Sequence, residues 1–483
     1  MSSRYRIEYQ LKQHRKDEFI EWIKGLLAVP FVLHSVDPVN NNNSQYEDEK
    51  LDSNTNAAHK KYLSIFKDIE DLVWEKLQLS NSRNLTIRDP FQTEQQQQED
   101  SLTLDFQKSG VFDVQSRLDQ LVPSIGPMFT GLPLTKAFIL EDSKKKISCR
   151  RFVSPSFNDI RHILNTAQIL QFGTAQNDVR LITFDGDVTL YEDGGNLTTT
   201  NRVVPRIISL LKLGVKIGIV TAAGYDEPEK YEERLYGLIQ LLQNDIGMDS
   251  VLKKNLLIMG GESNYLFQYS ETNNAGSVEG HFVKITPQSD WLLESMQKWS
   301  ARDMNATLDL AEILFETLKE KLNLPKESKI IRKERAVGIV PGYIQSKENA
   351  GEMIRLTFQR EQLEEMVLTV QKHLERFPPA NRVKFSCFDG GNDCWCDIGG
   401  KDLGLKILQK YFHEKVDNKN KSGAIQPSET LHIGDQFAPM GSANDFKARL
   451  SGCTLWIASP KETVDVLDLL LTQIEGGKES KKK

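Results

Sequence analysis

Cysteine is scarce in this chain, and its few cysteines do not suggest a disulfide framework. Only five occur among 483 residues, an odd number at irregular spacing. This usage is typical of reduced thiols inside a cell, where disulfides are rare. Cys394 and Cys396 lie close together but lack a second paired cluster, which argues against a structural zinc site.

Long hydrophobic runs are missing as well. The segment Met1–Asp17 is polar and charged, without the apolar region of a signal peptide. The longest apolar stretch, Leu26–Leu33, is too short to cross a bilayer and contains Pro30. We therefore expect a cytoplasmic protein that does not associate with membranes.

Positive charge is not in excess. The net charge of −6 argues against non-specific binding to nucleic acid, although a local basic patch could still bind an anion. The basic run at residues 144–151 could contact a polyphosphate, but a solvated surface is the commoner role of such runs. Hydrophobic residues make up 39% and charged residues 27%, as in ordinary globular proteins, and the length suits two or three domains.

The hydrophobic pattern divides the chain into two kinds of structure. Helical spacing dominates before residue 170, where two tracts rich in asparagine and glutamine (residues 40–56 and 95–98) are interpreted as solvated insertions. From residue 179 apolar runs typical of buried strands alternate with helical stretches. After residue 243 a long mixed section follows to about residue 382, and the alternation returns with residues 402–411. We therefore predict an α/β core interrupted by a long insertion. The expected helices are residues 5–29, 61–79, 159–170, 202–213, 229–243, 291–299, 309–322, 362–377 and 402–411, and the expected strands are 179–184, 215–220, 430–433 and 455–458.

Two acids, Asp185 and Asp187, follow the first predicted strand. Residues two apart on an extended chain point to the same side, so both carboxylates could face one ligand. Open α/β sheets bind their ligands at the carboxyl ends of the strands. A catalytic pair there would suit metal-assisted phosphoryl transfer through an aspartyl-phosphate. The alternative is a loop or helix-capping role.

Three further residues stand at predicted strand ends or helix starts. Thr221 ends the second strand beside small residues, and its hydroxyl could bind a phosphate oxygen or cap a helix. Lys401 follows two glycines at a helix start, where it could reach a bound anion or simply be exposed. Asp435 follows a third strand and could complete a divalent-metal site or serve as a turn residue. His432 alternates with apolar neighbours and is expected to be a core residue.

Each motif is ambiguous alone, but the four in this order resemble the haloacid dehalogenase (HAD) superfamily of phosphohydrolases. The resemblance covers residues 165–225 and 385–470, and the interval 226–384 resembles the cap domain that many members carry. The segments Thr183–Tyr191, Thr221–Tyr225 and Phe388–Leu405, with the long N-terminal extension, are similar to the IMP-specific 5′-nucleotidases.

This resemblance implies an architecture and an activity. The fold would be an α/β, HAD-like, doubly wound parallel sheet with a large inserted α/β cap. A mainly helical N-terminal regulatory region with polar loops would occupy residues 1–160. The activity would be hydrolysis of inosine 5′-monophosphate (IMP) to inosine and phosphate, with a Mg²⁺ requirement and activation by ATP through the N-terminal part. The resemblance also implies a homo-oligomer.

Roles for the motif residues are implied in the same way. Asp185 would be the nucleophile and Asp187 the general acid/base. Asp185, the main-chain carbonyl of Asp187 and Asp435 would hold Mg²⁺. Thr221 and Lys401 would bind the phosphate.

Further positions have a weaker basis. Asp193, Arg234 and Asp393 fall where the family contacts the nucleotide, although the sequence alone would leave Arg234 and Asp393 on the surface. Lys144 and His162, in and near the basic run, are candidates for the ATP effector site. Two other functions stay open: a HAD phosphatase or phosphomutase acting on a sugar phosphate, and a non-catalytic nucleotide-sensing protein.

Overall fold

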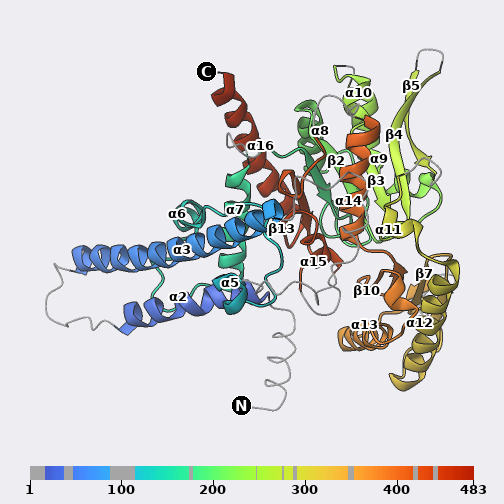
Figure 1. Ribbon diagram of the computed structural model, residues 1–483, viewed down its shortest axis with the longest axis horizontal. Helices are drawn as coiled ribbons and strands as arrows, with labels where there is room; N and C mark the ends of the chain where they lie inside the picture. Colours follow the sequence, from blue (N-terminus) through green and yellow to red (C-terminus); the bar gives the residue numbers. More distant parts are fainter. Residues whose placement is uncertain are drawn as a thin grey trace. The chain divides into compact units, whose positions relative to one another are not determined.

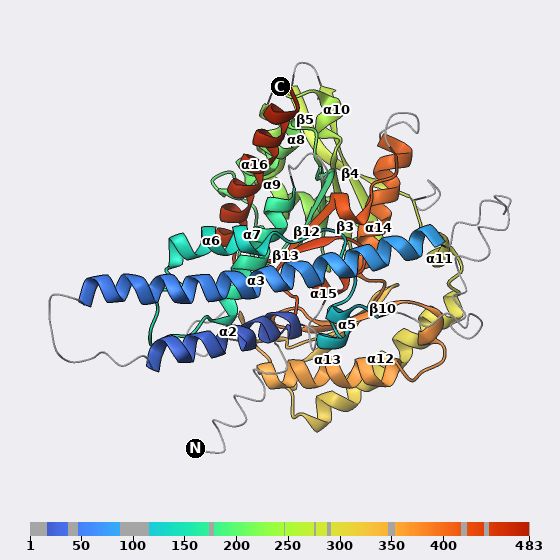
Figure 2. The same ribbon diagram turned by 60° about the vertical axis from the view of Figure 1, so that its left-hand side comes forward.

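The computed structural model describes most of the chain: residues 17–36, 47–86, 115–172, 178–245, 247–274, 277–286, 291–345, 353–416, 423–438 and 444–482. It divides into two compact units: residues 18–171 form the smaller one, and the larger one holds Asp17 and residues 172–483. Figures 1 and 2 show their helices and strands from two directions. Within the described residues, no helix is long and apolar enough to cross a membrane.

The smaller unit is helical, as predicted for the N-terminal region. Apolar residues recur every three or four positions along α3, so Tyr62, Phe66 and Val73 share one buried side. Phe138 of α6 packs on that side, with its ring centroid 5.1 Å from Phe66 and 5.9 Å from Tyr62. The helices are α2 (Glu18–Val36), α3 (Glu47–Thr86), α5 (Arg117–Leu121), α6 (Leu134–Lys145) and α7 (Phe157–Gln171).

Two predictions for this unit need correction, and each falls partly outside the described residues. The helix predicted over residues 5–29 is observed from Glu18, and residues 5–16 lie outside the described residues. Helix α3 begins at Glu47, inside the tract that was interpreted as an insertion, because a helix can extend through polar residues when its later turns are anchored by packing. The remaining residues of both polar tracts, 40–46 and 95–98, are not among those described.

Seven strands form the main sheet of the larger unit, in the order β13-β12-β1-β2-β3-β4-β5. The first five are parallel, and β4 and β5 add an antiparallel edge. Strand β1 lies between β12 and β2, with Phe184 opposite both Ile433 and Ile219. The strands are β1 (Leu181–Phe184), β2 (Lys216–Val220), β3 (Leu256–Gly260), β4 (Tyr265–Asn274), β5 (Ser277–Ile285), β12 (Thr430–Gly434) and β13 (Cys453–Trp456).

Helices cover this sheet, which explains why its central strands are buried throughout. Helix α14 packs on alternate strand residues that include Leu181, Val220 and Leu257. Its Leu408 comes so close to β2 that a Cβ on Gly218 would lie 2.5 Å from Leu408 Cδ1. Helix α8 packs on β2, and α16 packs on α8. The helical elements are α8 (Val203–Lys212), α9 (Pro228–Asn244), α10 (Ser250–Lys253), α11 (Glu294–Gln297), α14 (Lys401–Tyr411), η3 (Phe412–Val416), η4 (Pro427–Glu429), α15 (Asn444–Ala448) and α16 (Pro460–Lys482).

A second, antiparallel sheet has the order β10-β11-β7-β6. Helices α12 and α13 pack on it, and Phe315, Met366 and Val337 belong to the shared core. We call this sheet with its two helices the cap. Its elements are α12 (Ala301–Lys321), β6 (Lys329–Arg332), β7 (Ala336–Val340), α13 (Arg360–Leu374), η2 (Ala380–Arg382), β10 (Phe385–Asp389) and β11 (Cys394–Ile398), with a hairpin of β8 (Tyr343–Gln345) and β9 (Met353–Arg355).

The edges of the two sheets do not coincide with the boundaries predicted for the insertion, residues 226 and 384. Strands β3, β4 and β5 precede the cap and extend the main sheet, whereas β10 and β11 follow residue 384 and pair within the cap. The helix predicted over residues 291–299 is also shorter, because α11 covers only Glu294–Gln297. Trp291 is buried there and donates its indole N–H to the main-chain oxygen of Ile285, so it holds the chain before the helix begins.

Candidate active site

The predicted motif residues meet at the carboxyl ends of three neighbouring strands. Asp185 follows β1, and its main-chain N–H donates to the oxygen of Ile433 on β12. Thr221 follows β2 and is buried, and a Cβ on Gly186 would lie 3.5 Å from Thr221 Oγ1. Asp435 follows β12. The structure therefore brings three of the candidates together because parallel neighbours end at one edge of a sheet.

Lys401 connects this edge to helix α14. The side chain is completely buried, and its Nζ lies 2.8 Å from Asp185 Oδ2 and 2.7 Å from Asp445 Oδ1. An ammonium group has three N–H bonds, so within the described residues these two ion pairs leave one N–H for a further acceptor. Burial disfavours the charged amine, but the carboxylates of Asp185 and Asp445 outweigh it and raise the pKa of Lys401. Lys401 is thus a fixed cation at the strand ends.

The sequence analysis predicted no role for Asp445, yet this residue is central to the candidate site. Its Oδ2 accepts the main-chain N–H groups of Asp435 and Gln436, at 3.1 and 2.9 Å. Burial alone would raise the pKa of Asp445, but Lys401 and His432 lower it, so the group is a carboxylate. The signal that sequence reasoning missed is an acid ten residues after Asp435, at the start of the short helix α15.

Asp185, Asp435 and Asp445 together could hold a metal ion, because one oxygen from each lies within 4.8 Å of the other two. The residues fit a divalent cation. Three carboxylates face one lysine, and Oδ1 of Asp435 is buried without a hydrogen-bond partner among the described groups. Burial, with Asp445 and Asp185 nearby, raises the pKa of Asp435 well above its usual value. Such an orphaned oxygen suits Mg²⁺, which prefers oxygen ligands.

The carboxyl group of Asp185 has an unusually high pKa. Burial raises its pKa to about 7, against the opposing effect of Lys401 and with a contribution from Asp445. Its Oδ1 accepts the main-chain N–H of Gly186 at 2.8 Å. The side chain is therefore oriented by donors on both oxygens.

Asp187 points toward Arg234 of α9. Arg234 Nη1 donates to Asp187 Oδ1 over 3.3 Å, and the main-chain N–H of Gly194 donates to the same oxygen over 3.0 Å. The turn between Asp187 and the next element requires a left-handed residue, since Val188 has φ = 59°. A β-branched residue rarely adopts this conformation, and such outliers occur at sites that the surrounding structure holds in place.

Asp193 and Asp393 lie around the glycine turn between β10 and β11. A Cβ on Gly391 would lie 3.1 Å from Asp193 Oδ2, so Asp193 is beside the turn. Burial raises the pKa of Asp393 to about 6, although Arg355, 3.5 Å from its Oδ2, opposes this. Burial also raises the pKa of Asp389, with Asp193 contributing. The structure thus gathers three acids at this turn, of which sequence reasoning missed Asp389.

Comparison with known proteins identifies the family of this chain. The model of the IMP-specific 5′-nucleotidase family matches residues 1–467. The chain belongs to the IMP-specific 5′-nucleotidase family. It is 53% identical to IMP-specific 5′-nucleotidase 1 of Saccharomyces cerevisiae, over 98% of this chain and 99% of the relative. Enzymes of this family are phosphoric monoester hydrolases, and the predicted family, fold class and enzyme class are confirmed.

Solved structures of a Plasmodium falciparum IMP-nucleotidase are also similar. An IMP-bound mutant of that enzyme has 28% identity and a TM-score of 0.68, covering 95% of this chain and 94% of its own. Its ATP-bound form has 28% identity and a TM-score of 0.66, covering 97% and 88%.

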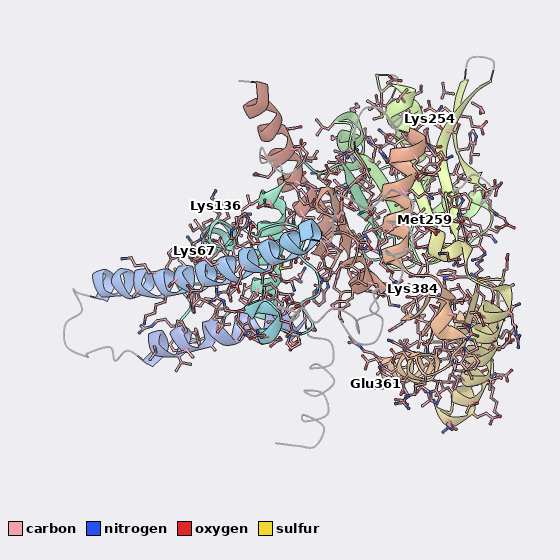
Figure 3. All side chains as sticks on the ribbon, viewed as in Figure 1. Lys67, Lys136, Lys254, Met259, Glu361 and Lys384 are labelled. Atoms are coloured by element: carbon pink, nitrogen blue, oxygen red, sulfur yellow. The ribbon has the colours of Figure 1, made fainter. Side chains whose placement is uncertain are left out.

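The turn at residues 261–264 is a third feature of the candidate site that sequence reasoning missed. Gly261, Glu262 and Ser263 have φ of 59°, 50° and 82°. The main chain of Glu262 donates to the oxygen of Thr221 and accepts from the N–H of Gly400, at 3.4 and 2.9 Å. The turn thus joins the two predicted phosphate-binding residues, Thr221 and Lys401. The main-chain oxygen of Lys384, which leads into β10, accepts the N–H of Gly399 at 2.7 Å, and Figure 3 labels Lys384 together with Met259 of β3.

The effector candidates lie in the smaller unit. Lys144 is exposed near the end of α6, 3.8 Å from Glu141, and His162 lies on α7 beside Arg161. The basic run is partly occupied by internal pairs, because Arg150 makes a bidentate contact with Asp159 at 2.7 and 3.1 Å. Their role in binding an effector stays a prediction.

Proposed function

We propose that this chain hydrolyses IMP to inosine and phosphate, with Mg²⁺ and through an aspartyl-phosphate on Asp185. The observation that carries the proposal is the buried group of Asp185, Lys401, Asp435 and Asp445 at the strand ends, within a chain of this family. The IMP-bound and ATP-bound relatives support the choice of substrate and effector.

Asp185, Asp435 and the main-chain oxygen of Asp187 would hold Mg²⁺. Asp445 would add negative charge near the metal more than it would bind the metal directly, because each of its oxygens already accepts two hydrogen bonds. When bound, Mg²⁺ supplies positive charge that offsets the repulsion between an anionic nucleophile and an anionic phosphate.

In the first step, an oxygen of Asp185 would attack the phosphorus in line as the bond to the 5′ oxygen breaks. Asp187 would give its proton to that departing oxygen. Lys401, with its remaining N–H, and the hydroxyl of Thr221 would bind the phosphate oxygens and stabilise the charge of the transition state. Arg234, which contacts Asp187, would bring the acid/base and the nucleotide together.

In the second step, Asp187 would take a proton from a water molecule whose oxygen attacks the phosphorus. The bond between Asp185 and phosphorus then breaks, which releases phosphate and restores both carboxyl groups. Asp193 and Asp393, beside the turn of the cap, would contact the nucleoside. We propose that the cap excludes water when the nucleotide binds, which would appear as nucleotide-dependent protection of the cap from proteolysis.

Phosphate release across IMP, AMP, GMP and hexose phosphates, with Mg²⁺ and with EDTA, tests the substrate and the metal. We expect IMP to be preferred and EDTA to abolish turnover. A preference for a hexose phosphate would overturn the assignment in favour of a sugar phosphatase or phosphomutase.

Rapid-quench labelling with [³²P]IMP tests the intermediate. The Asp187→Asn variant should at best accumulate labelled protein slowly, because the acid and the base are both removed, and Asp185→Asn should never become labelled. Near-normal turnover in Asp187→Asn would remove its acid/base role.

Activation by ATP is proposed to act through the smaller unit, with Lys144 and His162 in contact with the effector. The ATP response of Lys144→Ala should fall while activity without ATP is kept. Lys136→Ala, an exposed lysine on the same helix that Figure 3 labels, is the matched control. An unchanged ATP response in Lys144→Ala would exclude Lys144 from the effector site. A homo-oligomer and a cytoplasmic location likewise remain predictions, the former measurable by light scattering.

A further inference from the structure

His432 is a completely buried histidine to which the mechanism above gives no role. It lies on β12 between Leu431 and Ile433, and its ring is hydrogen-bonded on both nitrogens. Nε2 lies 2.8 Å from Asp445 Oδ1, and Nδ1 lies 2.9 Å from Thr183 Oγ1. Thr183 is also fully buried, two residues before Asp185 on β1.

Asp445 fixes the direction of the first hydrogen bond. Its carboxylate only accepts, so Nε2–H of His432 donates to it. In the neutral ring Nδ1 then carries no proton and accepts from the hydroxyl of Thr183. Burial lowers the pKa of His432, which favours this neutral form.

Among the described residues, the other hydrogen bonds of the Asp445 carboxylate come from Lys401 and from the main chain that follows β12. Oδ1 accepts from Lys401 at 2.7 Å, and Oδ2 accepts from the main chain of Asp435 and Gln436. Lys401 in turn contacts Asp185 at 2.8 Å. The hydrogen bonds therefore run from Thr183 through His432, Asp445 and Lys401 back to Asp185, and β1 closes the ring.

We propose that His432 and Thr183 are positioning residues, which hold the Asp445 carboxylate in the orientation that fixes Lys401 and the Asp435 main chain. The inference rests on the proposed function, in which Lys401 and Asp435 act on the phosphate and the metal. Without the donor of His432, the carboxylate of Asp445 is free to turn toward Lys401 alone, and the N–H groups after β12 lose their shared acceptor. Groups that orient the ligands of a metal site typically change metal affinity or activity about 10- to 100-fold when they are lost.

Two substitutions of Thr183 separate positioning from packing. Valine keeps the shape of threonine but lacks the hydroxyl, whereas serine keeps the hydroxyl and lacks the methyl group. That methyl group is packed, since a Cβ on Gly218 would lie 3.1 Å from Thr183 Cγ2. If the hydroxyl matters, Thr183→Ser keeps near-normal kcat and Thr183→Val loses about 10-fold or more, with a smaller change in KM. If only packing matters, the order is reversed.

His432 offers a second pair. His432→Gln can still donate to Asp445 and should retain part of kcat, whereas His432→Leu cannot and should lose about 10- to 100-fold. His373→Gln, an exposed histidine on α13, is the matched control and should behave as wild type. Circular dichroism and thermal melting establish that each variant is folded.

Two readouts keep this inference separable from the proposed substrate. Titration calorimetry with Mg²⁺ alone, without nucleotide, should show weaker binding for Thr183→Val and His432→Leu and unchanged binding for Thr183→Ser. Turnover of p-nitrophenyl phosphate should follow the same order, and it does not depend on recognition of IMP. If IMP fails as a substrate while both readouts keep this order, only the proposed function falls. Equal Mg²⁺ affinity and equal turnover in the valine and serine variants would overturn the inference.

Discussion

Replacing Asp185 with asparagine should abolish turnover and at the same time stabilise the metal-free protein at neutral and alkaline pH. The side chain is the proposed nucleophile, so its loss removes the first chemical step. The same carboxyl group is buried with a pKa of about 7, so keeping it ionised in the folded protein is unfavourable. Asparagine has nearly the same shape and no charge.

The size of this effect follows from the pKa. The folded-state value of about 7 lies above the usual value of 3.8, so the folded protein binds the proton more tightly than the unfolded chain. The contribution of Asp185 to the free energy of unfolding therefore falls as the pH rises from about 4 to about 7 and stays constant above that. Roughly three pH units at about 1.4 kcal/mol each give about 4 kcal/mol. Relative to wild type, Asp185→Asn should gain nothing at pH 4 and about 4 kcal/mol at pH 8.

Thermal unfolding of both proteins in EDTA, at several pH values between 4 and 8, measures this difference. The midpoint of Asp185→Asn should exceed that of wild type by an amount on the order of 5 °C at pH 8, and the two should converge at pH 4. Mg²⁺ should raise the midpoint of wild type at pH 8 far more than that of the variant, because the variant lacks one carboxylate of the cluster. A pH-independent difference between the two proteins, or equal stabilisation by Mg²⁺, would refute the reasoning.

Three further variants test neighbouring parts of the site. Gly434→Ala would place a Cβ 2.4 Å from Asp445 Cγ, so we expect a loss of about 1–3 kcal/mol in stability together with most of kcat. Arg234→Ala should raise KM for IMP at least tenfold, whereas its half-exposed pair with Asp187 contributes less than about 1 kcal/mol to stability, as thermal melting can check. Glu262→Gln should raise the melting temperature at pH 8 but not at pH 4. Burial raises the pKa of the Glu262 carboxyl, which has no hydrogen-bond partner among the described residues, so the wild type loses stability as the pH rises above about 4.5.

The sheet edge that holds the candidate site could be predicted because the signals for it are local in the sequence. Asp185, Thr221 and Asp435 each follow a short apolar run, and strands of that kind are buried in parallel sheets. Once the three strands are parallel neighbours, their carboxyl ends must converge. The position of Lys401 at a helix start could be predicted from the two glycines before it. The structure explains the first of them, because Gly399 has φ = 123° and a Cβ there would lie 2.0 Å from the oxygen of Glu262.

The limits of the cap could not be predicted in the same way, because strand pairing depends on distant partners. The residues of β10 and β11 were assigned to the core by the family resemblance, with no strand predicted there. Strand β11 instead pairs with β7, more than fifty residues earlier. Strands β4 and β5 form an antiparallel hairpin that continues the main sheet from β3. Local propensity indicates a strand but not its neighbour, since cross-strand packing decides the pairing.

The contacts of Asp445 and His432 show why residues around a candidate site escape sequence reasoning even when those directly at the strand ends do not. His432 alternates with apolar residues and was expected to be a core residue, and its burial confirms this. The pattern does not reveal the hydrogen-bond partners of His432. Thr183 is 249 positions away in sequence, and Asp445 lies after the strand that carries His432. A buried polar group must find a hydrogen-bond partner, so a histidine in an apolar strand indicates that a partner exists without saying which. When that strand ends at a catalytic edge, the missing partner is best sought among the acids that follow it.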